Sequence, residues 1–171
     1  MRKRNLLGGL LLLALPWQAG AELNVQVAAR VVSFLQPPPN GAVQAAIVFQ
    51  PGNAVSEADA TSIERAIGGG VAAGRASIRT RRVPISSLGT LGNYRAAFVT
   101  AGLRDEQPGI AAAAARGSVV TITSDQACVQ AARCVVGISS TPRVQITVSR
   151  AAARAANVRF GSAFLMLVKE I

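Results

Sequence analysis

Apolar residues follow two patterns near the start of the chain, one with helical spacing and one as an unbroken run. The spacing of Val27, Val31 and Leu35 predicts a helix over 22–35, and the three prolines that follow end it. Residues 43–49 form a compact apolar run, which is typical of a buried strand. The chain therefore begins with a helix and then a strand.

The same alternation continues to the C-terminus. Ser56 followed by Asp59 predicts the start of a helix, and Ser162 predicts the cap of the last one. Further helices are predicted over 56–67, 107–116, 151–156 and 163–170. Further strands are predicted over 76–84, 94–101 and 119–122, and a strand pair over 135–138 and 144–148.

This order predicts the fold class. Helices alternating with apolar strands favour an α/β fold: a single three-layer domain with a mostly parallel central sheet, helices on both faces, a late strand pair and C-terminal helices. The strands read as continuous apolar runs, as strands covered on both faces do. The length of 171 residues fits one such domain.

The N-terminus has the plan of a secretory signal peptide. A positive run at 2–4 precedes the apolar stretch 6–15, and the small residues Ala19 and Ala21 suit a signal peptidase. The apolar stretch is too short for a bilayer core, which needs about 20 residues. We expect cleavage after Ala21, which leaves a domain over 22–171 in an oxidising compartment; an uncleaved anchor is the alternative.

Two cysteines lie six positions apart in the exported part. In an oxidising compartment Cys128 and Cys134 most simply pair with each other, and two free buried thiols are the alternative. A straight helix would separate their Cα atoms by about 9 Å, beyond the roughly 7 Å that a disulfide tolerates. A bonded pair therefore predicts a folded-back loop or a broken helical turn.

Composition excludes several kinds of catalysis. The chain has no His, so it has no imidazole base or metal ligand and no Ser-His-Asp or Cys-His pair. Its 18 Lys and Arg against 8 Asp and Glu give a net charge of +10, and no pair of carboxylates is placed for hydrolysis. We therefore predict that the protein is not an enzyme and uses no cofactor or metal.

The densest positive charge lies on the predicted strand 76–84. Arg79, Arg81 and Arg82, with Arg75 nearby, are candidates for docking an acidic partner or anionic lipid headgroups. The alternative is a solvated edge strand whose charges discourage sheet-to-sheet pairing. Nucleic acid is not an expected partner, because an exported protein with few aromatic residues offers no stacking run.

Two further sets of residues suggest binding. The glycines at 68–70 resemble a phosphate loop, but they lack its Lys-Ser/Thr and follow a helix, so we interpret them as a helix C-cap and turn. Ligands of open α/β sheets bind beyond the carboxyl ends of the strands. Asn53, Thr100, Ser124 and Asp125 lie in those loops and are the candidate ligand-binding residues.

The last fifty residues resemble a known family. Residues 119–125 form an apolar strand ending in Ser-Asp, residues 143–149 form a second late strand, and a final segment with Val158, Phe160 and Gly161 follows. In this order the segments resemble the YfiR/HmsC-like family of small periplasmic proteins. The close cysteine pair falls where that family carries a short-loop disulfide.

The resemblance implies a function through contact. It implies a periplasmic α/β protein, often a homodimer, that restrains a membrane-bound diguanylate cyclase by binding its periplasmic sensor region. The expected partner is thus a membrane protein, a cyclase or a receptor, and the family's link between disulfide state and restraint makes the cysteine pair a candidate redox switch. A different class of function, a periplasmic module that binds a small solute, is the alternative.

Overall fold

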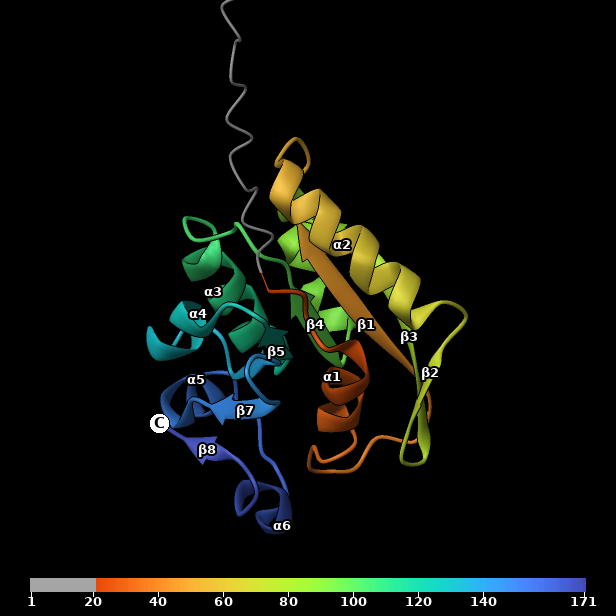
Figure 1. Ribbon diagram of the computed structural model, residues 1–171, viewed down its shortest axis with the longest axis vertical. Helices are drawn as coiled ribbons and strands as arrows, with labels where there is room; N and C mark the ends of the chain where they lie inside the picture. The colour runs from red at the N-terminus through yellow and green to blue at the C-terminus, as the bar shows by residue number, and fades with distance from the viewer. Residues whose placement is uncertain (1–20) are drawn as a thin grey trace, which may run out of the picture.

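The computed structural model describes residues 21–171 (Figure 1). The predicted signal peptide lies outside these described residues except for Ala21, so its cleavage stays a prediction. Within the described part, no helix is long and apolar enough to cross a membrane.

Eight strands of the described chain form one sheet, in the order β2-β3-β1-β4-β5-β6-β7-β8. The strands are β1 (Gly41–Phe49), β2 (Val71–Ala73), β3 (Ala76–Pro84), β4 (Ala96–Val99), β5 (Val120–Thr123), β6 (Val136–Ser139), β7 (Gln145–Val148) and β8 (Lys169–Glu170). The five strands from β3 to β6 in this order are mutually parallel. β2 pairs antiparallel with β3 and β7 antiparallel with β6, so the predicted mostly parallel sheet and late strand pair are confirmed.

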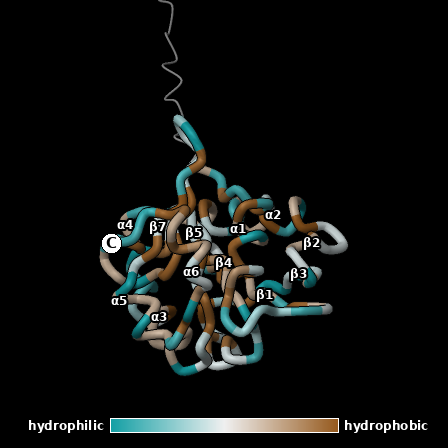
Figure 2. The backbone as a smooth tube through the Cα atoms, turned by 90° about the horizontal axis from the view of Figure 1, so that it is seen from below, coloured by the Kyte–Doolittle hydropathy of each residue, from teal (hydrophilic) through white to brown (hydrophobic). Residues whose placement is uncertain are grey.

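Helices cover both faces of the sheet, which confirms the predicted three layers. One face carries α1 (Val25–Val32), α2 (Ala54–Ile67), α5 (Arg150–Ala155) and α6 (Ser162–Leu165). The other carries the 3-10 segment η1 (Ile85–Asn93), α3 (Gln107–Gly117) and α4 (Gln126–Gln130). Hydrophobic segments run through the middle of the molecule around β4 and β5, with hydrophilic stretches in outer loops (Figure 2).

The central strands are apolar on both faces because each face packs on helices. Ile47 and Phe98 belong to the core on the α1 and α2 face, whereas their neighbours Val48 and Val99 belong to the core on the η1 and α3 face. All four are almost completely buried. This arrangement explains why the strands appear in the sequence as runs and not as alternating positions.

The predicted helix over 163–170 is wrong. α6 ends at Leu165, and the chain continues into β8, which pairs in parallel with β7. The Ile171 amide donates to the Val148 carbonyl at 3.0 Å, so the last residues satisfy the otherwise open edge of β7. The prediction that Ser162 caps this helix is therefore wrong: Gly161 is the N-cap, and Ser162 is the first residue of the helix.

The start of α2 also differs from the prediction. Asn53 is the N-cap, and its Oδ1 accepts a hydrogen bond from the Ser56 amide at 3.2 Å. Ser56 is buried inside the helix because its hydroxyl serves a tertiary contact. The C-cap at Gly68 is confirmed, but the strand β2 and the segment η1 were not predicted.

Candidate functional site

The strand order creates a switch point between β1 and β4. The chain leaves β1 through α2 toward β3 on one side, and leaves β4 through α3 toward β5 on the other. The loops that follow β1 and β4 therefore part at the carboxyl edge of the sheet, where ligands of open α/β sheets bind. Asn53 and Thr100 lie in these two loops, and Ser124 and Asp125 follow β5 at the same edge.

Asn53 joins the two loops of the switch point. Besides capping α2, its Nδ2 donates to the Gly102 carbonyl at 3.0 Å and to the Gln50 Oε1 at 3.2 Å. Both polar ends of this side chain are therefore engaged within the protein. The sequence placed Asn53 at the correct edge, and the structure shows that it holds the β1 and β4 loops together.

The hydroxyl groups of Ser56 and Thr100 form a chain of hydrogen bonds close to Asn53. Thr100 Oγ1 donates to the Val48 carbonyl at 2.9 Å, so its single proton is used and Ser56 Oγ must donate the 2.6 Å bond between the two hydroxyls. Ser56 Oγ in turn accepts from the Gln50 amide at 3.0 Å. Both hydroxyl side chains are buried, so Thr100 faces the interior and not the solvent.

Asp59 adds a carboxylate to the same contact. Its Oδ2 accepts a hydrogen bond from the Ala101 amide at 2.8 Å, so it links α2 to the β4 loop. Partial burial raises the pKa of Asp59 above its ordinary value, with the Ala101 hydrogen bond opposing the rise and nearby Glu22 adding to it. The interpretation of Asp59 as part of a helix start is wrong, because α2 begins at Ala54. Asp59 lies one turn after the buried Ser56 on the inner face of α2, and this spacing was the available signal in the sequence.

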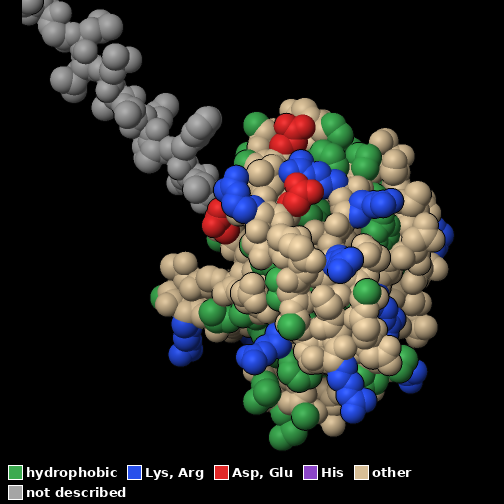
Figure 3. All heavy atoms as spheres, turned by 90° about the vertical axis from the view of Figure 1, so that its right-hand side faces the viewer, with side chains coloured by type: hydrophobic (Ala, Val, Ile, Leu, Met, Phe, Trp, Pro, Cys, Tyr) green, Lys and Arg blue, Asp and Glu red, His purple; other side chains and the backbone are tan. Residues whose placement is uncertain are grey.

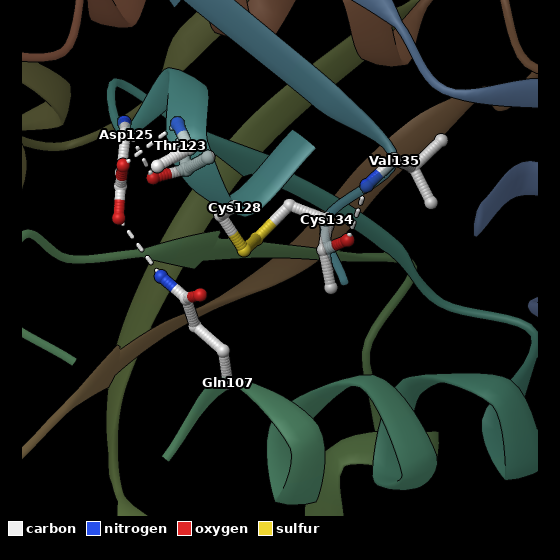
Figure 4. The surroundings of a disulfide bond; sticks show 8 residues. Gln107, Thr123, Asp125, Cys128, Cys134 and Val135 are labelled. Carbon is white, nitrogen blue, oxygen red and sulfur yellow. Dashed lines mark hydrogen bonds between the residues drawn. A yellow bond between two sulfur atoms is a disulfide. The ribbon is translucent and has the colours of Figure 1, made fainter. Parts of the chain in front are cut away.

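The β5 end of the edge is built around Asp125. Its Oδ1 caps α4 through the Ala127 amide at 3.0 Å, and its Oδ2 accepts from Gln107 Nε2 at 2.8 Å (Figure 4). Ser124 is half-buried, and its hydroxyl makes no hydrogen bond to the other described residues. Ligand binding at these residues stays a prediction, with Ser124 the one of the four candidates whose side chain is unengaged within the described chain.

The cysteine pair is a disulfide, so the alternative of two free thiols is wrong. Cys128 and Cys134 are bonded, with their Cα atoms 5.2 Å apart, and both are buried in the core beside α3 (Figure 4). The Arg133 amide bonds back to the Cys128 carbonyl at 3.0 Å after Ala132 at φ 55°, which is the predicted broken helical turn. Burial keeps the sulfur atoms from any reductant in solvent unless the loop opens.

The three candidate arginines do not form one patch. Arg82 lies on the α2 side, where its guanidinium meets Glu64 Oε2 at 2.9 and 3.1 Å and lies 5.6 Å from the Phe49 ring centroid. Arg79 and Arg81 are exposed on the opposite face of β3. The side of the molecule where β2 and β3 lie shows many Lys and Arg side chains and few Asp and Glu (Figure 3).

β2 pairs with only the first three residues of β3, so the outer side of the arginine segment is an open strand edge. The exposed arginines thus sit where edge charges are expected, which fits the solvated-edge interpretation. Partner binding by them stays a prediction.

A small hollow lies away from the carboxyl edge. Its volume is about 20 Å³, enough for a single water molecule. Its walls are Ala111, Ala114, Thr121, Ala132, Arg133, Val135, Ala152, Ala155 and Ala156. Over residues 21–171, no group of three or more Cys, Asp or Glu side chains is placed to hold a metal ion.

No protein-family model matches the chain, and no curated protein matches it. Solved structures do share its fold. One is the ABC domain in complex with L-Trp from Streptococcus pneumonia, with a TM-score of 0.59 and 10% identity over 85% of this chain. Another is a conserved domain protein from Vibrio cholerae O1 biovar El Tor, with a TM-score of 0.61 and 12% identity over 87% of this chain.

These similarities concern the fold alone. The aligned region covers 59% of the first structure and 60% of the second, so the present chain spans about three fifths of their lengths. They establish a mixed α/β domain.

Proposed function

We propose that this chain is a non-catalytic binding domain that takes a small polar solute at the carboxyl edge of its sheet. The observation that carries the proposal is the switch point between β1 and β4, since this is where open α/β sheets bind their ligands. The shared fold with a domain solved in complex with L-Trp supports the same function.

The exposed charged side chains at this edge suit a ligand that carries both a positive and a negative charge. Arg104 and Asp105 follow β4 and are exposed, and Glu57 lies in the first turn of α2. A guanidinium and a carboxylate in one loop can pair with the carboxylate and ammonium of an amino acid. Ser124 supplies a hydroxyl for a further hydrogen bond, so free amino acids are the first solutes to test.

The edge's acidic residues also support binding without catalysis. Asp125 is engaged by the Ala127 amide and Gln107, and Asp59 by the Ala101 amide. Glu57 accepts from the Gly52 amide at 3.1 Å. These three carboxylates hold loops in place, so we propose that they serve the structure of the edge and that the chain acts by contact.

A titration of the folded domain with L-Trp and other amino acids tests this function. We expect a ligand-dependent rise in the unfolding temperature that Arg104→Gln and Ser124→Ala reduce. Ser140→Ala, in the exposed hairpin turn, is the matched control and should bind as the parent does. No rise with any amino acid, or equal loss in the control, would overturn the proposed function.

A second candidate is regulation of a membrane partner. The buried Cys128–Cys134 disulfide favours it, because it occupies the place of the short-loop disulfide in the YfiR/HmsC-like family that the sequence resembles. On this proposal the chain, exported to the periplasm and able to form a homodimer, restrains a diguanylate cyclase or receptor by binding one state of it better than another.

Co-purification from detergent-solubilised membranes tests the second candidate. A cyclase or receptor should be recovered with the native chain and lost with Cys128→Ser if the disulfide shapes the binding surface. Recovery of no membrane protein would count against this candidate and leave the solute-binding proposal unaffected.

A further inference from the structure

Exposed large hydrophobic residues gather at one end of the molecule. Three of the six found among the described residues lie in two segments, residues 30–35 at the end of α1 and residues 159–170 around α6. Ile171 lies beside α5, where its carbonyl accepts from the Arg150 amide (Figure 1). The six are Phe34, Val55, Val144, Met166, Leu167 and Ile171. Single exposed apolar side chains need no explanation, but a group of them marks an interaction site.

The two segments form one built unit, which we name the apolar tip. The Phe34 ring stacks on Phe164 with centroids 4.9 Å apart, and the Gly161 amide donates to the Phe34 carbonyl at 3.0 Å. Phe164 is buried and anchors α6, whereas Met166 and Leu167 directly after it are 86% and 81% exposed. Phe164 is thus packed within the protein, whereas the side chains of Met166 and Leu167 contact solvent.

The apolar tip carries a positive flank. Arg30 lies one helical turn before Phe34, and Arg159 and Lys169 bracket α6, while Glu170 is the one acid of these segments. The salt bridge found within residues 21–171 joins Arg82 to Glu64, so these three cations have no carboxylate partner there. Projecting apolar side chains beside basic ones are the combination that binds an anionic bilayer surface.

We propose that the apolar tip attaches this protein peripherally to the surface of an anionic phospholipid bilayer. Met166 and Leu167 enter the interface between headgroups and acyl chains, and Arg30, Arg159 and Lys169 pair with lipid phosphates. A second copy of the chain fits this surface less well, because it would bring the same positive flank face to face. α6 and the start of α2 lie at opposite ends of the molecule (Figure 1), so the carboxyl edge would point away from the membrane.

Sedimentation with vesicles tests this proposal, using the chain from Glu22 onward, which keeps every described helix and strand. Binding is expected to vesicles of phosphatidylcholine with phosphatidylglycerol and to be much weaker without the anionic lipid. The double variant Met166→Ser/Leu167→Ser should reduce partition at least about tenfold, since it removes two buried apolar side chains from the bound state. Arg159→Gln should reduce it about fivefold and only with anionic vesicles.

Val55→Ser is the matched control, because Val55 is 54% exposed at the other end of the molecule. It should bind vesicles as the parent does, and circular dichroism checks that all variants fold. Equal binding by the parent and the double variant would overturn the proposal. The proposal would also be overturned if the parent did not bind vesicles but formed a dimer through the apolar tip. Analytical ultracentrifugation would then show a dimeric parent and a monomeric double variant.

Discussion

Thr100→Val tests the hydrogen-bonded closure of the switch point. Valine has nearly the same shape as threonine, so the change removes the hydroxyl and little else. The Val48 carbonyl keeps the Thr100 amide as a donor at 3.2 Å and is not left without a partner. The Ser56 hydroxyl, which is buried, loses the acceptor that it reaches at 2.6 Å.

The expected cost follows from these two losses. An orphaned buried donor costs about 1–3 kcal/mol, and the lost Thr100–Val48 bond adds about 1 kcal/mol or less. We therefore expect Thr100→Val to lower the free energy of unfolding by about 2–3 kcal/mol, or roughly 5–10 °C in midpoint for a domain of this size.

Urea unfolding followed by circular dichroism measures this change, since the single Trp, at position 17, lies in the predicted signal peptide. The double variant Ser56→Ala/Thr100→Val removes both hydroxyls, so it should cost about 1–2 kcal/mol less than the sum of the single variants. A loss below about 0.5 kcal/mol in Thr100→Val, or strictly additive effects, would refute the assigned network.

Three further predictions follow from other parts of the structure. Burial raises the pKa of Asp59 in the folded state, so the stability that Asp59 contributes is fully present below its unfolded-state pKa and is lost as pH rises through its folded-state pKa. Asp59→Asn keeps an acceptor for the Ala101 amide but does not titrate, so it should flatten this pH dependence in unfolding curves taken from acid to neutral pH. Replacing Cys128 and Cys134 by Ser should cost about 2.4 kcal/mol by chain entropy and leave the fold intact by circular dichroism; global unfolding would refute a local role. Phe164→Ala should cost about 3–5 kcal/mol in urea unfolding, because its ring is buried against Phe34; a cost under about 1 kcal/mol would contradict that packing.

The central elements could be predicted because their signals are local. Residues 43–49 are apolar without interruption because both faces of β1 pack on helices, and Gly68 ends α2 through its own backbone conformation. The broken turn around the disulfide followed from the reach of a bond between Cys128 and Cys134.

The errors arose where a distant contact outweighs local preference. The residues after Leu165 have a helical apolar pattern, but the open edge of β7 takes up the chain end as β8. Ser56 resembles a helix cap in sequence, yet Thr100 supplies a buried partner 44 positions away. The carboxyl edge as the place of the site could be predicted from strand order. The hydrogen bond from Asn53 to the Gly102 carbonyl could not, because it depends on how two loops 49 positions apart meet.

The most direct test of the central claim is a map of where a solute contacts the folded domain. Amide shifts in a ¹⁵N-labelled sample, followed while an amino acid such as L-Trp is added, report this residue by residue. We predict saturable changes confined to the loops after β1, β4 and β5, over residues 50–57, 100–107 and 123–126. Absence of change with every amino acid, or changes centred elsewhere on the sheet, would contradict it.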